Sequence, residues 1–253
     1  MTLTDVPTYL LTITRMTSLE DLWASHEARM ASYGFDRVFY AATRFRTDRG
    51  MGDMKDALIL TNYPPEFTGP YLDGGLFRDA PMVRWAMVNT GTRSWREIAE
   101  DYRADRLTPG ERRVCEFNAL HGVVAGYGIS FPRTSARSGH GIGLASTNLD
   151  QDAIDAIWTE HGAEIELINN VTHLALMSLP YGAHGHRLTA RQREVLELVA
   201  DGKTVQDVAT VLGRNPATVE KHLRLAREAL DVETTAQAIL KASVQNQFHR
   251  YTA

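Results

Sequence analysis

Short helices with strong capping signals fill the segment 188–247, and they constrain the fold more than any other feature of the sequence. Thr189, Thr204 and Asn215 each precede an apolar helical pattern, and their side-chain oxygens can accept a hydrogen bond from a backbone N–H of the first turn. Pro216 stands at a first helical position, where a missing N–H costs nothing, and the first two helices each stop at a glycine. A fourth helix follows. The sequence therefore predicts an all-α module of four short helices.

The second and third of these helices are joined by a tight turn that contains glycine, and the third helix is cationic. Its spacing predicts that Val219, Leu223 and Ala226 face inward. The polar residues on its other faces are Thr218, Lys221, His222, Arg224 and Arg227. Two short capped helices with a cationic second member are the sequence form of a helix-turn-helix. The alternative is a small helical bundle whose Lys and Arg side chains are simply solvated.

The stretch LTARQREVLELVADGKTVQDVATVLGRNPATVEKHLRLAREALDVETTAQAI resembles the helix-turn-helix domain of the LuxR family over its whole length. The positions that match the family motif are Leu188, Thr189, Glu194, Val195, Leu196, Ala200, Gly202, Val208, Ala209, Leu212, Thr218, Val219, His222, Leu230 and Ala238. Asn215 stands where serine is usual and Asp231 where glycine is common. Asparagine caps a helix as well as serine does, so the first departure should not matter.

This resemblance implies a particular way of contacting double-stranded DNA. The helix that begins at Pro216 would lie in the major groove. The residues implied to contact base edges or phosphates are Thr218, Lys221, His222 and Arg224. Those implied to contact phosphates at helix N-termini are Lys203, Thr204 and Asn215.

The larger N-terminal part has a mixed pattern. Segments 37–43 and 57–62 read as strands, two more strands follow Val123, and the segment 150–179 reads as one long helix. Helices at both ends with strands between them predict an α+β fold: an α/β/α sandwich with a central antiparallel sheet, followed by the four-helix module. The breakers in PYGAHGHR mark a linker at 180–187 between domains 1–179 and 188–253, and we expect proteolysis there first.

Composition excludes several classes of protein. No apolar run is long enough to span a bilayer, and the N-terminus lacks the features of a secretory signal. The single cysteine, Cys115, can form neither an internal disulfide nor a CxxC metal knuckle, which predicts a cytoplasmic protein without a metal site. The net charge is −4, but residues 188–253 hold nine Lys and Arg against eight Asp and Glu. The acidic balance therefore lies in the N-terminal part and does not argue against DNA as a partner of the helical module.

The N-terminal part lacks the motifs of two common input domains. A phosphoacceptor receiver needs an acidic pair after its first strand, whereas Glu20 and Asp21 fall inside the helix that begins at Ser18. An ATPase needs a P-loop, and the sequence contains none. What remains is an aromatic cluster that can line an apolar cavity for a small amphiphile, or can simply form a core. Its members are Tyr63, Phe67, Tyr71, Leu72, Met82, Val83 and Trp95.

This cluster resembles the acyl-homoserine-lactone-binding domain of quorum-sensing LuxR regulators. Tyr71 matches the family tyrosine, Pro81 the proline of a D-P dipeptide, and Trp95 the tryptophan fourteen residues after it. The resemblance implies that Tyr71 and Trp95 contact the acyl and lactone carbonyls of the ligand, Trp95 through its indole N–H. A later glycine of the motif falls at Gly126 or Gly128, with Gly126 preferred, and Ser130 completes the candidate ligand-binding set.

Two departures from the family pattern bear on the ligand. Phe67 replaces the first tryptophan of the motif, and Ala80 falls where an aspartate normally accepts the ligand amide N–H. Asp79 lies one residue earlier and can take that role only if the backbone shifts, because neighbouring residues point in different directions. An amide N–H left without an acceptor costs about 1–3 kcal/mol. The ligand is therefore either an acyl-homoserine lactone served by Asp79 or a related amphiphile without a buried amide donor.

Taken together, these patterns predict a homodimeric transcription factor that binds a small amphiphile and regulates promoters at a palindromic operator. The long helix 150–179 is predicted to form the dimer interface, together with the last helix. No catalytic constellation and no cofactor motif is recognisable, so an enzyme such as a lactonase is disfavoured. The alternative within the same family is a regulator without a lactone ligand, including one whose cavity is filled by its own aromatic side chains.

Overall fold

The computed structural model describes residues 5–44, 46, 52, 54–133, 135–181 and 187–248. The chain divides into two compact units, residues 1–177 and 178–253. Most of the predicted linker, residues 182–186, lies outside the described residues.

A five-stranded antiparallel sheet with the order β2-β1-β5-β4-β3 forms the centre of the N-terminal unit. Its strands are β1 (Arg37–Thr43), β2 (Leu58–Thr61), β3 (Gly91–Ser94), β4 (Ala125–Ser130) and β5 (Gly139–Ser146). Because side chains alternate across a strand, Phe39 and its partner Gly143 share one face, whereas Tyr40 and its partner Ile142 share the other.

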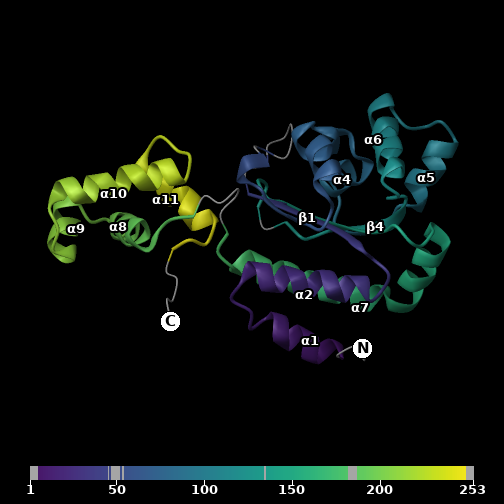
Figure 1. Ribbon diagram of the computed structural model, residues 1–253, viewed down its shortest axis with the longest axis horizontal. Helices are drawn as coiled ribbons and strands as arrows, with labels where there is room; N and C mark the ends of the chain where they lie inside the picture. Colours follow the sequence, from purple (N-terminus) through teal and green to yellow (C-terminus); the bar gives the residue numbers. More distant parts are fainter. Residues whose placement is uncertain are drawn as a thin grey trace. The chain divides into compact units, whose positions relative to one another are not determined.

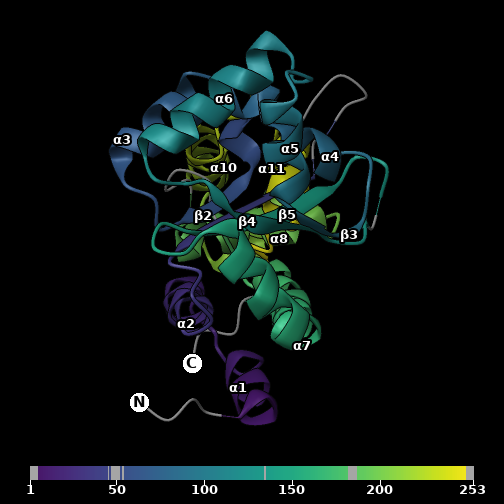
Figure 2. The same cartoon turned by 90° about the vertical axis from the view of Figure 1, so that its right-hand side faces the viewer.

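Helices cover both faces of this sheet, as predicted (Figures 1 and 2). One face carries α2 (Leu19–Ala31) and α7 (Gln151–Ser178), with α1 (Val6–Ile13) beyond them. The other face carries α3 (Pro65–Thr68), the helical turns η2 (Gly69–Asp73) and η3 (Leu76–Asp79), α4 (Pro81–Ala86), α5 (Arg96–Arg103) and α6 (Pro109–Leu120). The short turn η1 (Met54–Asp56) precedes β2. The α/β/α sandwich is confirmed.

The layer between the sheet and helices α2 and α7 is a closed apolar core. Leu22, Met30, Val38, Ile165 and Ile168 are completely buried there. The spacing of these residues, three and four apart on the helices, is what places them on one stripe facing the sheet.

The C-terminal unit consists of α8 (Ala190–Ala200), α9 (Val205–Leu212), α10 (Pro216–Ala229) and α11 (Thr235–Val244). Each helix starts with a side-chain cap: Thr189, Thr204, Asn215 and Thr234 accept from the backbone N–H three residues ahead. Helix α10 packs on the other three helices through buried Val219, Leu223 and Ala226. The predicted four-helix module is therefore present, with the turn between α9 and α10 made by Gly213 in the left-handed region, φ +60°.

Candidate ligand cavity and nucleic-acid interface

A cavity of about 740 Å³ lies between the sheet and the layer of α3 to α6. Its floor consists of small residues on three neighbouring strands, Ala41, Gly128, Gly141 and Gly143. A Cβ at Gly128 would lie 2.2 Å from Met82 Cε, so a larger residue there would displace the methionine that forms part of the wall. Alternating glycines on β4 and β5 thus leave room above the sheet where side chains would otherwise fill it.

Aromatic rings packed against one another form one wall of this cavity. The ring of Phe67 lies 4.4 Å from that of Tyr63, 5.2 Å from Tyr71 and 5.0 Å from Phe117, measured between centroids. Phe39 on β1 contacts both tyrosines edge-on. Burial raises the pKa of the Tyr63 and Tyr71 hydroxyls, so both phenols stay protonated and can donate hydrogen bonds into the cavity.

Four described lining residues have buried side-chain polar atoms without a hydrogen-bond partner. Two of these atoms are the indole Nε1 of Trp95 and the amide Oδ1 of Asn118; the others are Arg46 Nε and the ring nitrogens of His140, whose ring lies beside that of His173. A buried polar group without a partner costs about 1–3 kcal/mol, so native proteins seldom retain one without a reason. A bound molecule that accepts from Trp95 and donates to Asn118 would remove both penalties.

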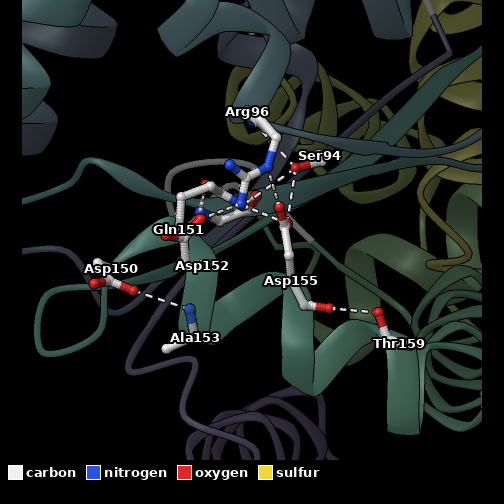
Figure 3. A network of polar contacts seen from close by, with 9 residues as sticks. Ser94, Arg96, Asp150, Gln151, Asp152, Ala153, Asp155 and Thr159 are labelled. Carbon is white, nitrogen blue, oxygen red and sulfur yellow. Dashed lines mark hydrogen bonds and ion pairs between the residues drawn. The ribbon is translucent and has the colours of Figure 1, made fainter.

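A polar network beneath the cavity fixes the backbone on either side of Trp95 (Figure 3). Arg96 Nε donates to Asp155 Oδ2 at 2.5 Å, and Ser94 Oγ donates to Asp155 Oδ1 at 3.0 Å. Gln151 Nε2 donates to the same carboxylate at 2.8 Å. Burial alone would raise the pKa of Asp155, but these donors outweigh it and lower the pKa, so the carboxylate stays charged. The start of α7 is thereby tied to the segment that carries the cavity tryptophan.

Six of the ten predicted ligand-binding residues line this cavity. They are Tyr63, Phe67, Tyr71, Met82, Val83 and Trp95. Ala80, at the position of the family aspartate, is buried and also lines it.

The other four predicted residues lie elsewhere, and each placement has a physical reason. Leu72 follows Tyr71 within the turn η2, so the two side chains point apart and only Tyr71 lines the cavity. Gly126 serves packing, because a Cβ there would lie 2.3 Å from the carbonyl oxygen of Leu144, and it is Gly128 that lines the cavity. Ser130 donates its hydroxyl to the carbonyl oxygens of Ala86 and Asn89.

Asp79 does not face the cavity. Its carboxylate lies against the first turn of α6, where a Cβ at Gly110 would approach it to 2.6 Å, and it pairs with Arg113 at 3.6 Å. Its side chain is 47% exposed. In this structure the Asp79 carboxylate is therefore not placed to replace the missing aspartate.

Several lining residues were not identified from the sequence. Asn118 sits on α6, a helix that begins with a capping box between Thr108 and Glu111. Phe39 and Ala41 alternate with buried core residues on β1, and this alternation alone would have placed them on the second face of the sheet. Tyr102 also lines the cavity, from α5, a helix that the sequence reading missed.

The predicted DNA-contacting residues gather on the first turns of α9 and α10 and along α10. Lys203, Lys221 and Arg224 are exposed, and Arg224 forms an ion pair with Glu228 one turn later. Thr218 and His222 are half-buried. Thr204 and Asn215 use their side chains as helix caps, so the groups they leave for a phosphate are backbone N–H groups of the helix N-termini.

Three further sequence features have a structural role. His26, His140 and His173 are buried on the α2 and α7 side of the sheet, and desolvation lowers their pKa to about 4, about 4 and about 3. Burial also raises the pKa of the Cys115 thiol, which disfavours the reactive thiolate. Within the described parts of the chain, no group of three or more His, Cys, Asp or Glu side chains is arranged to hold a metal ion. No described helix is long and apolar enough to cross a membrane.

A cavity under a helical layer and a helix-turn-helix together define the class: a DNA-binding regulator with a small-molecule input domain. Comparison with known proteins identifies the family. Residues 18–176 match the autoinducer binding domain model, and residues 186–230 match the model for sigma-70 region 4. The chain therefore belongs to the autoinducer-binding LuxR-type quorum-sensing transcriptional regulators.

Individual relatives agree with this assignment. The transcriptional activator LuxR of Aliivibrio fischeri is 27% identical over 189 residues, which cover 74% of this chain and 73% of LuxR. The crystal structure of Escherichia coli SdiA has the same fold, with a TM-score of 0.56 at 18% identity over 97% of this chain and 98% of SdiA. The N-acylhomoserine lactone-dependent LuxR-family factor CepR2 of Burkholderia cenocepacia gives a TM-score of 0.53 at 19% identity, covering 68% of this chain and 96% of CepR2.

Proposed function

We propose that this chain is a homodimeric, ligand-responsive regulator that binds a small amphiphile in the cavity and a palindromic operator through α10. It acts in the cytoplasm as a binding protein and not as an enzyme, and it needs no cofactor other than its effector. The observation that carries the ligand half of the proposal is the cavity of about 740 Å³ with an unpartnered indole N–H. That volume is within the range of small-molecule sites, which are mostly apolar with a few polar groups.

Helix α7 supports the homodimer part of the proposal. Leu167 and Leu174 on α7 are 49% and 68% exposed, and half-buried Val171 lies between them at helical spacing. An exposed apolar stripe on a long helix is the kind of surface that a second copy covers by symmetry. Leu240 on α11 is 57% exposed and offers a second contact in the C-terminal unit.

Dimerisation explains how ligand can control DNA binding. A dimer that reads a palindrome must place its two recognition helices about 34–36 Å apart, one turn of DNA. A ligand that binds better to the arrangement with this spacing shifts the population toward it. A gel shift on a selected operator, with and without a compound that binds in the cavity, determines whether that shift is toward DNA binding or away from it.

The ligand half is tested by thermal unfolding of the intact protein with N-acyl homoserine lactones of several chain lengths. A ligand at one hundred times its dissociation constant adds about 2.7 kcal/mol of stability. We expect the Trp95→Phe variant to bind the stabilising compound about tenfold more weakly, because the indole donor is lost. Absence of stabilisation by any compound of the series would contradict the ligand half.

The DNA half is tested by gel shift on a selected operator. Lys221→Ala and Arg224→Ala should each weaken binding without unfolding the protein, and a lost phosphate contact lowers the salt slope by about one. Lys241→Ala, on α11 outside the helix-turn-helix pair, is the matched control and should bind normally. Unchanged affinity of both test variants would contradict the assignment of α10 as the recognition helix.

A further inference from the structure

The cavity has a buried hydrogen-bond acceptor, Asn118 Oδ1, that is not part of the family motif and does not lie at the position of the family aspartate. Asn118 lies in the last turns of α6, and its Oδ1 is buried with no hydrogen-bond partner. Asn118 lines the same cavity as the aromatic residues Tyr63, Phe67 and Tyr71. The backbone carbonyl of Asn118 is already used, accepting from His121 and Val123, so the side-chain amide is the group left over.

Other acceptors near the cavity are less suited to a ligand. Asp79 lies outside it, and Ala80 has no acceptor in its side chain. Glu116 lines the cavity but is exposed to solvent. His140 alternates with Gly139 and Gly141 on β5, so its ring lies on the opposite face of the sheet, 4.9 Å from the ring of His173.

We propose that Asn118 is a specificity-determining residue, the acceptor for a hydrogen-bond donor on the ligand head group, in place of the absent aspartate. This inference rests on the proposed function, because it assigns a role toward the ligand of that cavity. The donors among the other lining residues, Trp95 Nε1 and the protonated phenols of Tyr63 and Tyr71, take the acceptors of the same head group.

The chemistry of these groups defines a ligand class. A neutral amide oxygen, unlike a carboxylate, does not favour a cationic donor, and most of the wall is aromatic or aliphatic, with Arg46, Arg103 and Glu116 as its charged members. The ligand is therefore an amphiphile whose head group carries both a carbonyl-type acceptor and an N–H or O–H donor. An amide-linked lactone belongs to this class, held through Asn118 rather than through the position before Pro81.

A matched pair of probes separates this role from mere packing. N-octanoyl homoserine lactone and the ester in which oxygen replaces its amide N–H differ only in the donor, and pairs with six- and twelve-carbon chains extend the set. Calorimetry on the wild-type protein should show the amide of a binding pair bound about tenfold more tightly than the ester, the usual cost of leaving a buried acceptor unmet. In Asn118→Leu, which keeps the side-chain size but removes the acceptor, the two probes should bind within about twofold of each other.

Two further variants keep the test decisive. Asn118→Asp keeps the acceptor and should preserve the amide preference, which also covers the case in which Asn118→Leu fails to fold. Asp79→Asn, at a site outside the cavity, should leave the preference unchanged. Equal binding of amide and ester by the wild type would overturn the inference, as would an amide preference that survives in Asn118→Leu, and both results would leave the proposed function intact. If no pair binds at all, the proposed function fails and the inference fails with it.

Discussion

The helix-turn-helix unit and the cavity layer differ in how the hydrogen bonds of their polar groups are satisfied. In α8 to α11, every helix N-terminus has a side-chain cap, and three of these caps are reciprocal capping boxes. In the cavity layer, Trp95 Nε1 and Asn118 Oδ1 are buried without partners, and strand glycines leave space where side chains would pack. The first region satisfies its helix N-termini with its own side chains, whereas the second has both the room and the unmet hydrogen bonds that a ligand would supply.

This difference indicates which part of such a regulator can respond to a small molecule. The helix-turn-helix unit has capped helices around a packed core of its own, so its fold does not depend on a small molecule. A cavity with unmet donors and acceptors gains stability whenever a complementary molecule binds. The four predictions below test that contrast, beginning with the largest effect.

Mild acid should destabilise the N-terminal unit far more than the helix-turn-helix. His26, His140 and His173 are buried and neutral, with pKa values lowered by desolvation to about 4, about 4 and about 3. Between about pH 6.5 and pH 4 the unfolded chain binds protons that the folded core excludes, so the free energy of unfolding falls as pH falls. From pH 7 to pH 5 one such histidine contributes about 2 kcal/mol, and the three together lower the free energy of unfolding by a few kcal/mol, because His140 and His173 are in contact and do not titrate independently.

The C-terminal unit offers the contrast within the same molecule. Hydrogen bonds from Thr204 lower the pKa of Asp207, so its contribution is lost only below about pH 4, outside this window. Hydrogen exchange on the intact chain should therefore show peptides of α2 and α7 losing protection at pH 5 while those of α8 and α10 keep it. His26→Gln should reduce the pH response of the N-terminal unit, and equal acid sensitivity of both units would contradict the prediction.

Truncating a core side chain should cost more in the closed unit than at the cavity wall. Leu196 on α8 is fully buried, and Leu196→Ala creates a void that the surrounding helices cannot fill, at a cost of about 2–5 kcal/mol. Val83 on α4 already faces open space, so Val83→Ala should cost less than about 1 kcal/mol without ligand. Chemical denaturation of each variant measures both values, and similar losses would show that the cavity wall is as tightly packed as the core.

How much could be read from the sequence follows the same division. The starts of α8, α9 and α10 were predicted to the residue, because a cap and its partner lie three positions apart and need no knowledge of the rest of the chain. The strands β1, β4 and β5 and the long α7 were also recovered, since their periodicity reflects burial against a neighbouring layer.

The cavity was only partly predictable, because its members come from distant parts of the chain. Strand β3 and helix α5 were missed: GTRS has no fully buried residue and no apolar alternation, and α5 is rich in charge. Gly126 and Gly128 cannot be distinguished by spacing alone, since only the opposing strand shows which one meets a backbone and which one meets Met82. Asn118 gave no signal, because a lone asparagine on a helix is ordinary until the absence of a partner is visible.

Removing one cap should show how local the stability of the closed unit is. Asn215 Oδ1 accepts from the backbone N–H of Thr218 at 2.8 Å, and also from its hydroxyl at 2.9 Å. Asn215→Ala should lower the free energy of unfolding of this unit by about 1 kcal/mol and weaken DNA binding, since α10 then starts less rigidly. Asn215→Ser, which keeps a cap, should restore most of the loss. Calorimetric unfolding checks the energy, and equal loss from the alanine and serine variants would contradict a capping role.

The smallest effect is expected for Asp79→Ala. This variant tests whether the side chain next to the position of the family aspartate contributes to ligand binding. Its carboxylate lies at the N-terminal turn of α6 and pairs with Arg113, both on the exposed side, so Asp79→Ala should lower stability by only about 0.3–1 kcal/mol. Affinity for any cavity ligand should stay within twofold of wild type, because no atom of Asp79 lines the cavity. Ala80→Asp is the informative counterpart: it would place a carboxylate on the cavity wall, which should cost stability in the free protein and recover part of that cost only when an amide N–H is bound. Calorimetry of one amide-linked lactone on wild type and both variants settles the matter, since a loss of tenfold or more in Asp79→Ala would mean that the loop before α4 rearranges to bring Asp79 to the ligand.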